Sequence, residues 1–249
     1  MTRMIAEIGL NHLGSEERAW DMLKKILQTD IDAVTFQIRE PNFYASDDHT
    51  HRPLPLEFYS AASKLAHEHG KEFGLALCDI DAVEKICSEV QIDFWKTLSW
   101  DFLNDLIKTK LIKTRLPVYL STGLSSMAEV VRESKYTPNA ILIHTQLSQA
   151  IGDVNLKAIA TMRNQTEMPV AFGMHCEDVD VLKLALAYEP YAIFFYVKEE
   201  GLEGLFDDLH AIGIAKLPMV LQKLKVLSAS IGNGDKQGMQ KPSWVVSNE

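Results

Sequence analysis

The sequence predicts a single (β/α)8 barrel, and three observations support this fold class. Short, almost continuously apolar runs of strand length recur eight times along the 249 residues, as expected for parallel strands buried on both faces. Amphipathic segments alternate with these runs at uniform spacing, which is typical of repeated strand–helix units. No GxGxxG turn follows the first run. Because periodicity does not show whether a sheet closes, a doubly wound open sheet is the alternative fold.

The predicted strands occur in regular order along the chain. They are residues 4–9, 32–37, 72–77, 93–98, 117–122, 140–145, 169–174 and 191–197. The clearest amphipathic helices between them are residues 16–28, 56–70 and 179–188. Gly70 stands where a helix C-cap is expected. The one long connection, residues 39–55, follows the second strand, and loops of this length are usually functional or mobile. We expect one barrel domain over residues 1–230 and a surface tail over residues 231–249.

Composition argues against several classes of protein. The formal net charge is −9 and the pI is near 5.4, without a Lys/Arg run, so neither nucleic acid nor an anionic membrane is expected as a partner. The three cysteines lack metal-ligand spacing, so disulfides are not expected and a reducing cytoplasm is the default location. No signal peptide is apparent, and no apolar run approaches the ~20 residues that span a bilayer.

The first predicted strand contains a carboxylate where an apolar side chain is expected. In the segment IAEIGLNHLG, residues 5–14, Glu7 stands among apolar residues, and Asn11 follows in the connection. An unpaired buried charge costs several kcal/mol, so Glu7 needs a partner or a use. Lys96, near the end of the fourth predicted strand, is the candidate partner. In a purely structural interpretation, this ion pair closes the mouth of the barrel and has no role in function.

Polar side chains also end or follow the other predicted strands, at the rim where (β/α)8 barrels carry their active sites. They are Gln37, Arg39, Asp79, Asp81, Ser99, Asp101, Ser121, Thr122, His144, Thr145, His175, Glu177, Lys198 and Glu199. Taken singly, each has a structural interpretation, and His144 could be a core histidine with satisfied hydrogen bonds. As a set that converges on one rim, they favour a small-molecule site.

Charge limits the chemistry of such a rim. The groups that suit an anionic ligand, such as a phosphate or a carboxylate, are Lys96, Arg39, Ser99, Ser121 and Thr122. Glu7 and Asp101 could move protons or bind sugar hydroxyls. His175 and Glu177 offer ligands to a divalent metal, although two residues are a weak metal signature.

The ordered motifs resemble the N-acetylneuraminate (sialic acid) synthase family. They are IAEIGLNHLG, DAVTFQIREP, WKTLSWDFLN, LSTG, ILIHT, DVNLKAIATMR and the strand-seven His175, and the match continues to GNGDK near the end. The resemblance implies a (β/α)8 barrel, in agreement with the strand count. It also implies an enzyme that condenses phosphoenolpyruvate with an N-acetylmannosamine-type sugar, using Mn²⁺ or Mg²⁺, to make a nine-carbon acidic sugar.

The resemblance assigns roles position by position. Glu7 matches a glutamate that acts near the reacting carbons. Lys96 and Ser99 match residues that hold the phosphate and carboxylate of phosphoenolpyruvate, and Asp101 stands where the family has an acidic residue for the sugar. The other matched positions are Gln37 and Arg39 in an F-Q-x-R segment, Asn104, Ser121 at the phosphate and His175 as the first of two metal-ligand histidines. Asn11 and His144, within matched motifs, are further candidates for substrate binding.

The chain departs from the family pattern at its phosphate and metal positions. Thr35 replaces a lysine, and Tyr196 replaces the second metal histidine. Gly173 and Met174 replace a serine and an aspartate before His175. The C-terminal antifreeze-like domain of the family is not expected here, and a homodimer of barrels is plausible.

These departures leave alternatives for the metal and for the reaction. Either the metal has been lost, or a neighbour replaces the missing ligand, the candidates being Glu177, Cys176, Glu199 and Tyr196. The leading hypothesis is the condensation itself. The alternatives are a diverged enzyme with another donor or acceptor, and a catalytically silent barrel that binds a sugar or a partner enzyme.

Overall fold

Eight parallel strands form a closed barrel in the computed structural model, which describes residues 2–45, 47–137, 139–202, 204–236 and 238. They are β1 (Arg3–Gly9), β2 (Ala33–Ile38), β3 (Glu72–Leu77), β4 (Phe94–Thr97), β5 (Val118–Ser121), β6 (Ile141–Thr145), β7 (Val170–Met174) and β8 (Ala192–Lys198). Each strand pairs with the next, and β1 also pairs with β8, from Arg3 opposite Ala192 to Glu7 opposite Tyr196. This closing pair confirms the barrel and excludes the open sheet.

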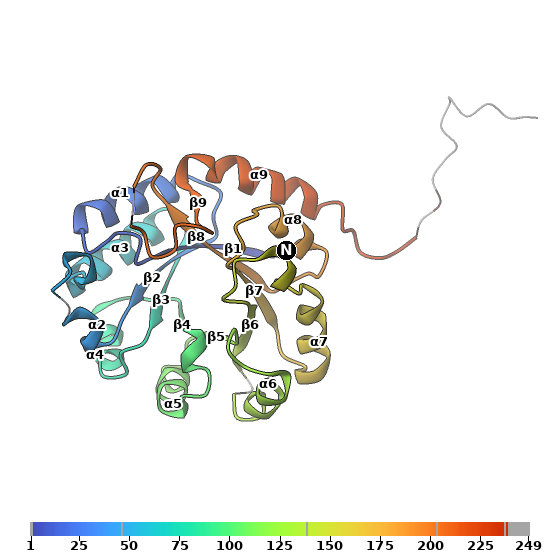
Figure 1. Ribbon diagram of the computed structural model, residues 1–249, viewed down its shortest axis with the longest axis horizontal. Helices are drawn as coiled ribbons and strands as arrows, with labels where there is room; N and C mark the ends of the chain where they lie inside the picture. The colour runs from blue at the N-terminus through green and yellow to red at the C-terminus, as the bar shows by residue number, and fades with distance from the viewer. Residues whose placement is uncertain (1, 46, 138, 203, 237, 239–249) are drawn as a thin grey trace, which may run out of the picture.

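Helices surround the barrel on its outside (Figure 1). The α-helices are α1 (Glu16–Leu27), α2 (Pro41–Tyr44), α3 (Leu56–Glu68), α4 (Ala82–Glu89), α5 (Asp105–Lys113), α6 (Met127–Ser134), α7 (Lys157–Thr166), α8 (Val181–Leu186) and α9 (Leu217–Ser228). Short 3-10 helices are η1 (His49–His51), η2 (Ser99–Asp101), η3 (Ile151–Asp153) and η4 (Ile214–Lys216). A short strand β9 (Ile212–Gly213) pairs with the end of β8 outside the barrel.

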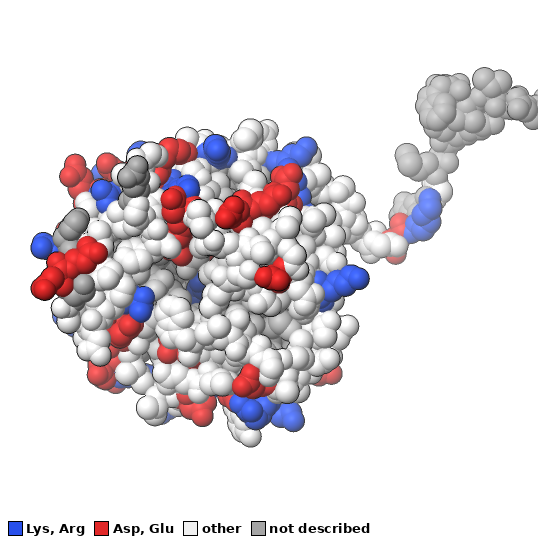
Figure 2. Space-filling model, viewed as in Figure 1, with Lys and Arg blue, Asp and Glu red and all other residues white. Residues whose placement is uncertain are grey.

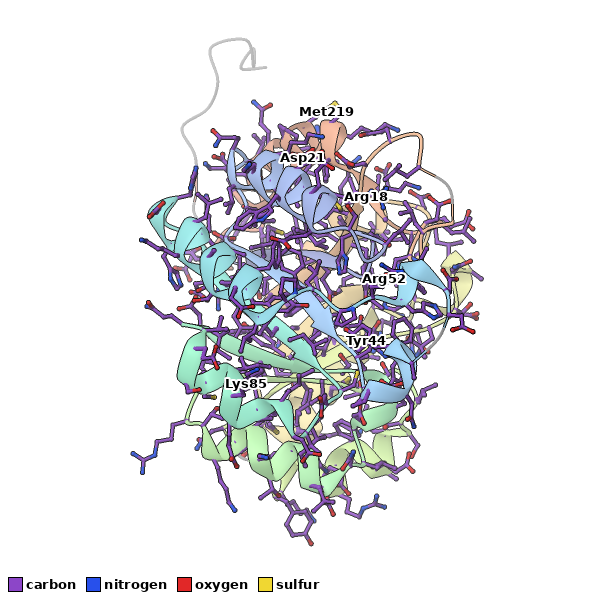
Figure 3. All side chains as sticks on the ribbon, turned by 90° about the vertical axis from the view of Figure 1, so that its left-hand side faces the viewer. Arg18, Asp21, Tyr44, Arg52, Lys85 and Met219 are labelled. Carbon is purple, nitrogen blue, oxygen red and sulfur yellow. The ribbon has the colours of Figure 1, made fainter. Side chains whose placement is uncertain are left out.

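The helices form where the amphipathic pattern predicts them. In α1, Ser15 caps the first turn, two glutamates follow it, and the buried residues include Met22 and Ile26 at helical spacing. Figure 3 shows charged side chains such as Asp21 of α1 and Lys85 of α4 on the outer surface. Helix α3 ends as expected, because Gly70 adopts a positive φ of 67° just after its last residues.

Aromatic side chains fill the inside of the barrel below its rim. Phe94 and Tyr119 pack with ring centroids 5.2 Å apart, and Tyr119 and Phe194 with centroids 5.0 Å apart. Gly74 makes room for them, because a Cβ at this position would lie 2.2 Å from the Phe94 ring. The interior of the barrel is therefore filled by packed side chains, and these close the barrel beneath its rim.

The connection after β2 and the C-terminal tail are the two segments that the sequence predicted to lie outside the regular alternation. The long connection after β2 contains α2 and η1 and is therefore not a structureless loop. Across the described ranges, no helix combines the length and apolarity that a membrane crossing needs. Of the expected tail, residues 237 and 239–249 lie outside the described residues, and residues 231–236 are exposed.

Candidate functional site

The end of β1 turns sharply at Gly9 and leaves Glu7 at the top of the barrel. Glu7 lies between Thr35 of β2 and Tyr196 of β8 in the strand register, which shifts between Glu7 and Gly9. Gly9 has a φ of 56°, and a Cβ there would lie 2.7 Å from the Tyr196 ring. Glycine is needed here because the positive φ and the close ring both exclude a side chain.

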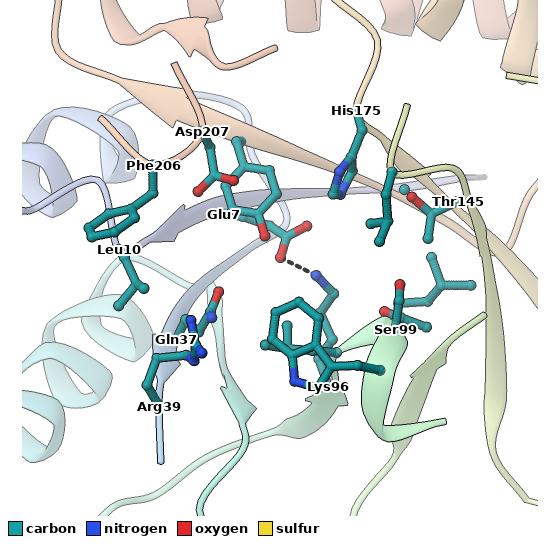
Figure 4. A pocket seen from close by; sticks show the side chains of 17 residues that line it. Glu7, Leu10, Gln37, Arg39, Lys96, Ser99, Thr145, His175, Phe206 and Asp207 are labelled. Carbon is teal, nitrogen blue, oxygen red and sulfur yellow. Dashed lines mark hydrogen bonds and ion pairs between the residues drawn. The ribbon is translucent and has the colours of Figure 1, made fainter. Parts of the chain in front are cut away.

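Glu7 forms a buried ion pair with Lys96 of β4. Lys96 Nζ lies 2.5 Å from Glu7 Oε2, and both side chains are almost fully shielded from solvent (Figure 4). Burial raises the pKa of the Glu7 carboxyl, while the Lys96 charge acts in the opposite direction. The Lys96 ammonium also lies 5.5 Å and 5.7 Å from the ring centroids of Phe194 and Tyr196. The charge within the apolar strand is thus compensated from another strand.

The ion pair lies at a pocket of about 150 Å³ at the rim of the barrel. Figure 2 shows a hollow near the middle of this face, bordered largely by uncharged residues. The sequence-predicted rim residues that line the pocket are Glu7, Gln37, Arg39, Lys96, Ser99, Ser121, Thr145 and His175. This volume is small compared with the roughly 300–1,000 Å³ of typical ligand pockets, so it suits a ligand of few atoms.

Hydroxyl groups and a second cation complete the polar part of the pocket. Ser99 Oγ accepts a hydrogen bond of 3.2 Å from the Gly123 amide, which leaves its own proton to be donated to a ligand. A Cβ at Gly123 would lie 2.8 Å from that oxygen, so the close approach requires glycine. Arg39 donates hydrogen bonds of 2.9 and 2.8 Å to the Glu40 carboxylate, which offsets part of its charge.

Five other candidates do not line this pocket: Asn11, Asp101, Asn104, His144 and Glu177. Asn11 is fully buried, where its amide donates to the Val197 carbonyl and its oxygen accepts from the Asp207 amide. It therefore ties β1 to the end of β8 and to the segment that follows. His144 Nε2 lies 2.9 Å from the Val154 carbonyl, and burial lowers the pKa of this imidazole. This contact agrees with the structural interpretation of His144 as a core histidine.

Asp101 is the last residue of η2, and Asn104 directly precedes α5. The Asn104 side chain caps this helix, and its Nδ2 lies 3.3 Å from Asp101 Oδ1. Burial raises the pKa of the Asp101 carboxyl. Glu177 is exposed and lines a separate surface hollow with Gln149 and Asp178, so it does not join His175 in the central pocket.

The connection after β8 supplies two groups that sequence reasoning missed. Asp207 lines the pocket, and its charge acts to raise the pKa of Glu7. His210 is buried with its ring stacked on His175, the centroids being 4.7 Å apart and the planes 9° apart. The sequence signal was present as the polar run Asp207, Asp208 and His210 before the next apolar residues. The run lies nine residues or more after the end of β8, so its position in the sequence does not indicate that it returns to the rim of the barrel.

The residues around His175 provide a test of metal binding. Burial, with His210 and Lys96 nearby, lowers the pKa of His175 to about 3, so its imidazole is neutral and could bind a metal. Both ring nitrogens of His210 are buried without a hydrogen-bond partner in the described part of the chain. Within that part, however, no three His, Cys, Asp or Glu side chains are grouped so as to hold an ion. The donor set of the described residues does not fit a metal centre with three protein ligands.

A family model and several known sequences match most of this chain. A model of the NeuB family matches residues 22–236. An uncharacterized protein of Methanocaldococcus jannaschii is 25% identical, over 98% of this chain and 76% of its own length. The N,N'-diacetyllegionaminic acid synthase of Campylobacter jejuni is 21% identical, over 95% of this chain and 79% of its own length.

A solved structure has the same fold. The N-acetylneuraminic acid (sialic acid) synthetase of Leptospira borgpetersenii, crystallised in complex with citrate, superposes with a TM-score of 0.86 at 20% identity. The match covers 96% of this chain and 88% of that one. At this identity the likeness shows the barrel and not the reaction.

Proposed function

Because the chain belongs to the NeuB family, we propose that it joins phosphoenolpyruvate, or a related three-carbon acid, to an N-acetylmannosamine-type sugar. The homologues are synthases, which supports an enzyme that forms a carbon–carbon bond from small-molecule substrates. The observation that carries the proposal is the buried Glu7–Lys96 pair in a small pocket with hydroxyl groups and a second cation. The absence of disulfides among Cys78, Cys87 and Cys176 is consistent with a cytoplasmic location.

The donor acid is proposed to bind against the cations. Lys96 and Arg39 supply positive charge, and hydroxyl donors come from Ser99 in η2 and Ser121 at the end of β5. An anion that approaches Lys96 compensates its buried charge when the Glu7 carboxyl is protonated. The roughly 150 Å³ pocket has room for a three-carbon acid but not for a hexose in addition, so the sugar is expected nearer the mouth.

Glu7 is proposed to transfer the proton. In the condensation, the methylene carbon of phosphoenolpyruvate bonds to the aldehyde carbon of the sugar, whose oxygen takes a proton, and water displaces phosphate. A carboxyl whose pKa is raised by burial holds its proton closer to neutral pH, which suits a general acid. Asp207, which lines the pocket, replaces Asp101 in our assignment as the carboxylate that orients sugar hydroxyls.

A second candidate function is a condensation with a less highly charged donor. It is favoured by Thr35, which stands where the family pattern has a lysine and whose hydroxyl is buried without a hydrogen-bond partner among the described residues. Loss of one cation weakens a phosphate site by roughly 1.5–3 kcal/mol. Donors such as pyruvate would be affected less than phosphoenolpyruvate.

Phosphate release tests the proposal. Purified protein is mixed with phosphoenolpyruvate and N-acetylmannosamine, with and without Mn²⁺, and inorganic phosphate is followed over time. We expect release that falls at least 100-fold in Glu7→Gln and Lys96→Met. Lys198→Met is the control, because Lys198 pairs with Asp208 and does not line the pocket. Release that persists in Lys96→Met would contradict the proposed role, and thermal stabilisation by pyruvate without any phosphate release would favour the second candidate.

A further inference from the structure

The Asp207 carboxylate lies in the pocket although Asp207 does not belong to a barrel strand. Asp207 follows the end of β8 by nine residues, and it lines the pocket together with Glu7 (Figure 4). A Cβ at Gly9 would lie 3.5 Å from Asp207 Oδ2, so the carboxylate rests against the turn that ends β1. Strand pairing fixes Glu7 but not Asp207, so another contact must hold Asp207 in this place.

Asn11 supplies a contact of this kind between β1 and the connection after β8. Its side chain is fully buried. Asn11 Oδ1 accepts a hydrogen bond of 3.2 Å from the Asp207 amide, and Asn11 Nδ2 donates one of 2.9 Å to the Val197 carbonyl. These backbone groups lie 196 and 186 residues further along the chain. A buried amide that uses both its oxygen and its nitrogen is held in one orientation, so Asn11 fixes the Asp207 backbone relative to β1.

The Asp207 carboxylate itself is less firmly held. Its Oδ1 lies 3.5 Å from His210 Nε2, but that nitrogen has no hydrogen-bond partner among the described residues, so the contact is not a hydrogen bond. Lys198, at the end of β8, pairs with Asp208 instead. The place of the carboxylate in the pocket therefore depends on the Asp207 backbone, and the side chain that holds this backbone is Asn11.

We propose that Asn11 is a positioning residue, which holds the Asp207 carboxylate beside Glu7 by fixing the Asp207 backbone. Asn11 does not line the pocket and is fully buried, so it acts through Asp207 and not by touching a substrate. Its two hydrogen bonds set the distance between the negative charge of Asp207 and the candidate proton donor. The inference rests on the proposed function in one respect, because that function makes Glu7 the proton donor.

Several charged or titratable side chains surround Glu7. Those that act on it directly are Lys96 of β4, Tyr196 of β8, and Asp207 and His210 of the connection after β8, while Arg39 and His175 line the same pocket. The Lys96 charge favours the ionised carboxylate, whereas the Asp207 charge favours the protonated carboxyl. Asn11 holds the backbone of Asp207, so loss of Asn11 should reach Glu7 through Asp207.

NMR titration of the Glu7 carboxyl in the full chain tests this role without requiring turnover. The glutamate carboxyl carbons are labelled with 13C, and the Glu7 signal is assigned by through-bond correlation to its backbone amide. We expect Asn11→Ala to lower the pKa of Glu7, as Asp207→Asn does, because each variant takes the Asp207 charge away from Glu7. The double variant should show no further shift beyond that of Asp207→Asn.

A matched control separates positioning from a general loss of structure. Ser63 is buried outside the pocket, and its hydroxyl donates a hydrogen bond to the Gln91 carbonyl. Ser63→Ala therefore also removes a buried hydrogen bond from a side chain to the backbone, and it should leave the Glu7 titration unchanged. If Asn11→Ala does not unfold cooperatively, Asn11→Ser, which keeps a short acceptor, takes its place with the same expected direction.

Phosphate release gives a second, independent measurement. We expect Asn11→Ala to lower kcat/KM at least about 5-fold in the wild-type background, but less than about 2-fold in the Asp207→Asn background. This difference arises because Asn11 has nothing left to position once the Asp207 charge is gone. A purely structural role for Asn11 would lower kcat/KM by the same factor in both backgrounds.

The outcomes distinguish the positioning role from the proposed reaction. An unchanged Glu7 titration in folded Asn11→Ala or in Asp207→Asn would overturn the role of Asn11, and so would additive shifts in the double variant. Phosphate release on which the two substitutions act independently would overturn that role while the proposed reaction stands. Coupled shifts of the Glu7 titration without any phosphate release would instead support the role of Asn11 and contradict the proposed reaction.

Discussion

Glu7 of β1 and Lys96 of β4 form a buried ion pair of 2.5 Å, although 89 residues separate them in the sequence. Each side chain removes the main electrostatic cost of burying the other, so neither is expected to be tolerated alone. The pair also brings the candidate proton donor and the candidate anion-binding group to the same point. Glu7 and Lys96 are therefore expected to affect both the stability of the protein and the proposed reaction.

Breaking this pair should destabilise the protein strongly. Lys96→Met or Glu7→Gln alone is expected to lower the free energy of unfolding by about 3–5 kcal/mol, because one buried group loses its partner. The double variant should lose clearly less than the sum of the two single losses. Urea denaturation measures all three. As a control, Lys25→Met breaks the more exposed pair with Glu199 and should cost less than about 1 kcal/mol. Additive losses in the double variant would contradict the coupling.

Asp207 should control the pH dependence of the reaction. Its negative charge acts to raise the pKa of Glu7, so Asp207→Asn lowers that pKa. The limb of the kcat/KM profile that reports Glu7 should move to lower pH. Asp208→Asn is the matched control, because the neighbouring carboxylate pairs with Lys198 instead. An equal shift in both variants would rule out a specific effect of Asp207.

Two histidines with lowered pKa values should make the fold sensitive to acid. Burial, with the Arg18 charge nearby, lowers the pKa of His12 to about 4, and the pKa of His175 is lowered to about 3. The unfolded chain, with histidine pKa values near 6.5, binds more protons between these limits, so stability falls as pH drops below 6.5. At about 1.4 kcal/mol per pKa unit, each histidine contributes on the order of 2 kcal/mol of loss by about pH 5.

Denaturation with urea at several pH values measures this effect. His175→Gln, which does not titrate, should make the slope of stability against pH shallower by up to one proton between pH 6.5 and about pH 4. A slope that is the same in His175→Gln and the wild type would show that His175 is not buried as a neutral group.

The hydroxyl of Thr97 should be dispensable for stability. Thr97 in β4 is fully buried, and its Oγ1 has no hydrogen-bond partner within the described residues. Thr97→Val keeps the branched shape and removes the unpaired polar atom, so a gain of about 1 kcal/mol is expected in chemical denaturation. Thr97→Ser keeps the hydroxyl and loses a methyl group, which should cost about 1 kcal/mol. A loss in the valine variant would indicate that the hydroxyl is hydrogen-bonded in solution.

Local patterns predicted the scaffold well. The ends of all eight barrel strands lie within two residues of their predicted positions, because a strand buried on both faces must be almost continuously apolar. Glu7 and Lys96 stood out for the same reason, as charges inside such strands. The ordered motifs predicted the family, and the match of the family model over residues 22–236 confirms it.

Side-chain direction at the rim could not be read in the same way. Asn104 stands one residue before α5 and caps that helix, and Asn11 hydrogen-bonds the backbone beyond β8. Asp207 and His210 enter the site from a connection whose path depends on these contacts. A polar residue after a strand can turn toward the pocket, cap a helix or bind backbone groups, and its own sequence neighbours do not select among these.

The sequence by itself therefore determined the alternation of strands and helices, the family and the need to compensate a buried carboxylate. Only the tertiary structure decided that Lys96 compensates it, that Asp207 and His210 join the site, and that Trp100 and Phe206 face the mouth. The physical reason is that apolar periodicity is a local property of each strand or helix. The polar residues at the rim, by contrast, come together only when β8 pairs with β1 and the connections between distant strands become neighbours.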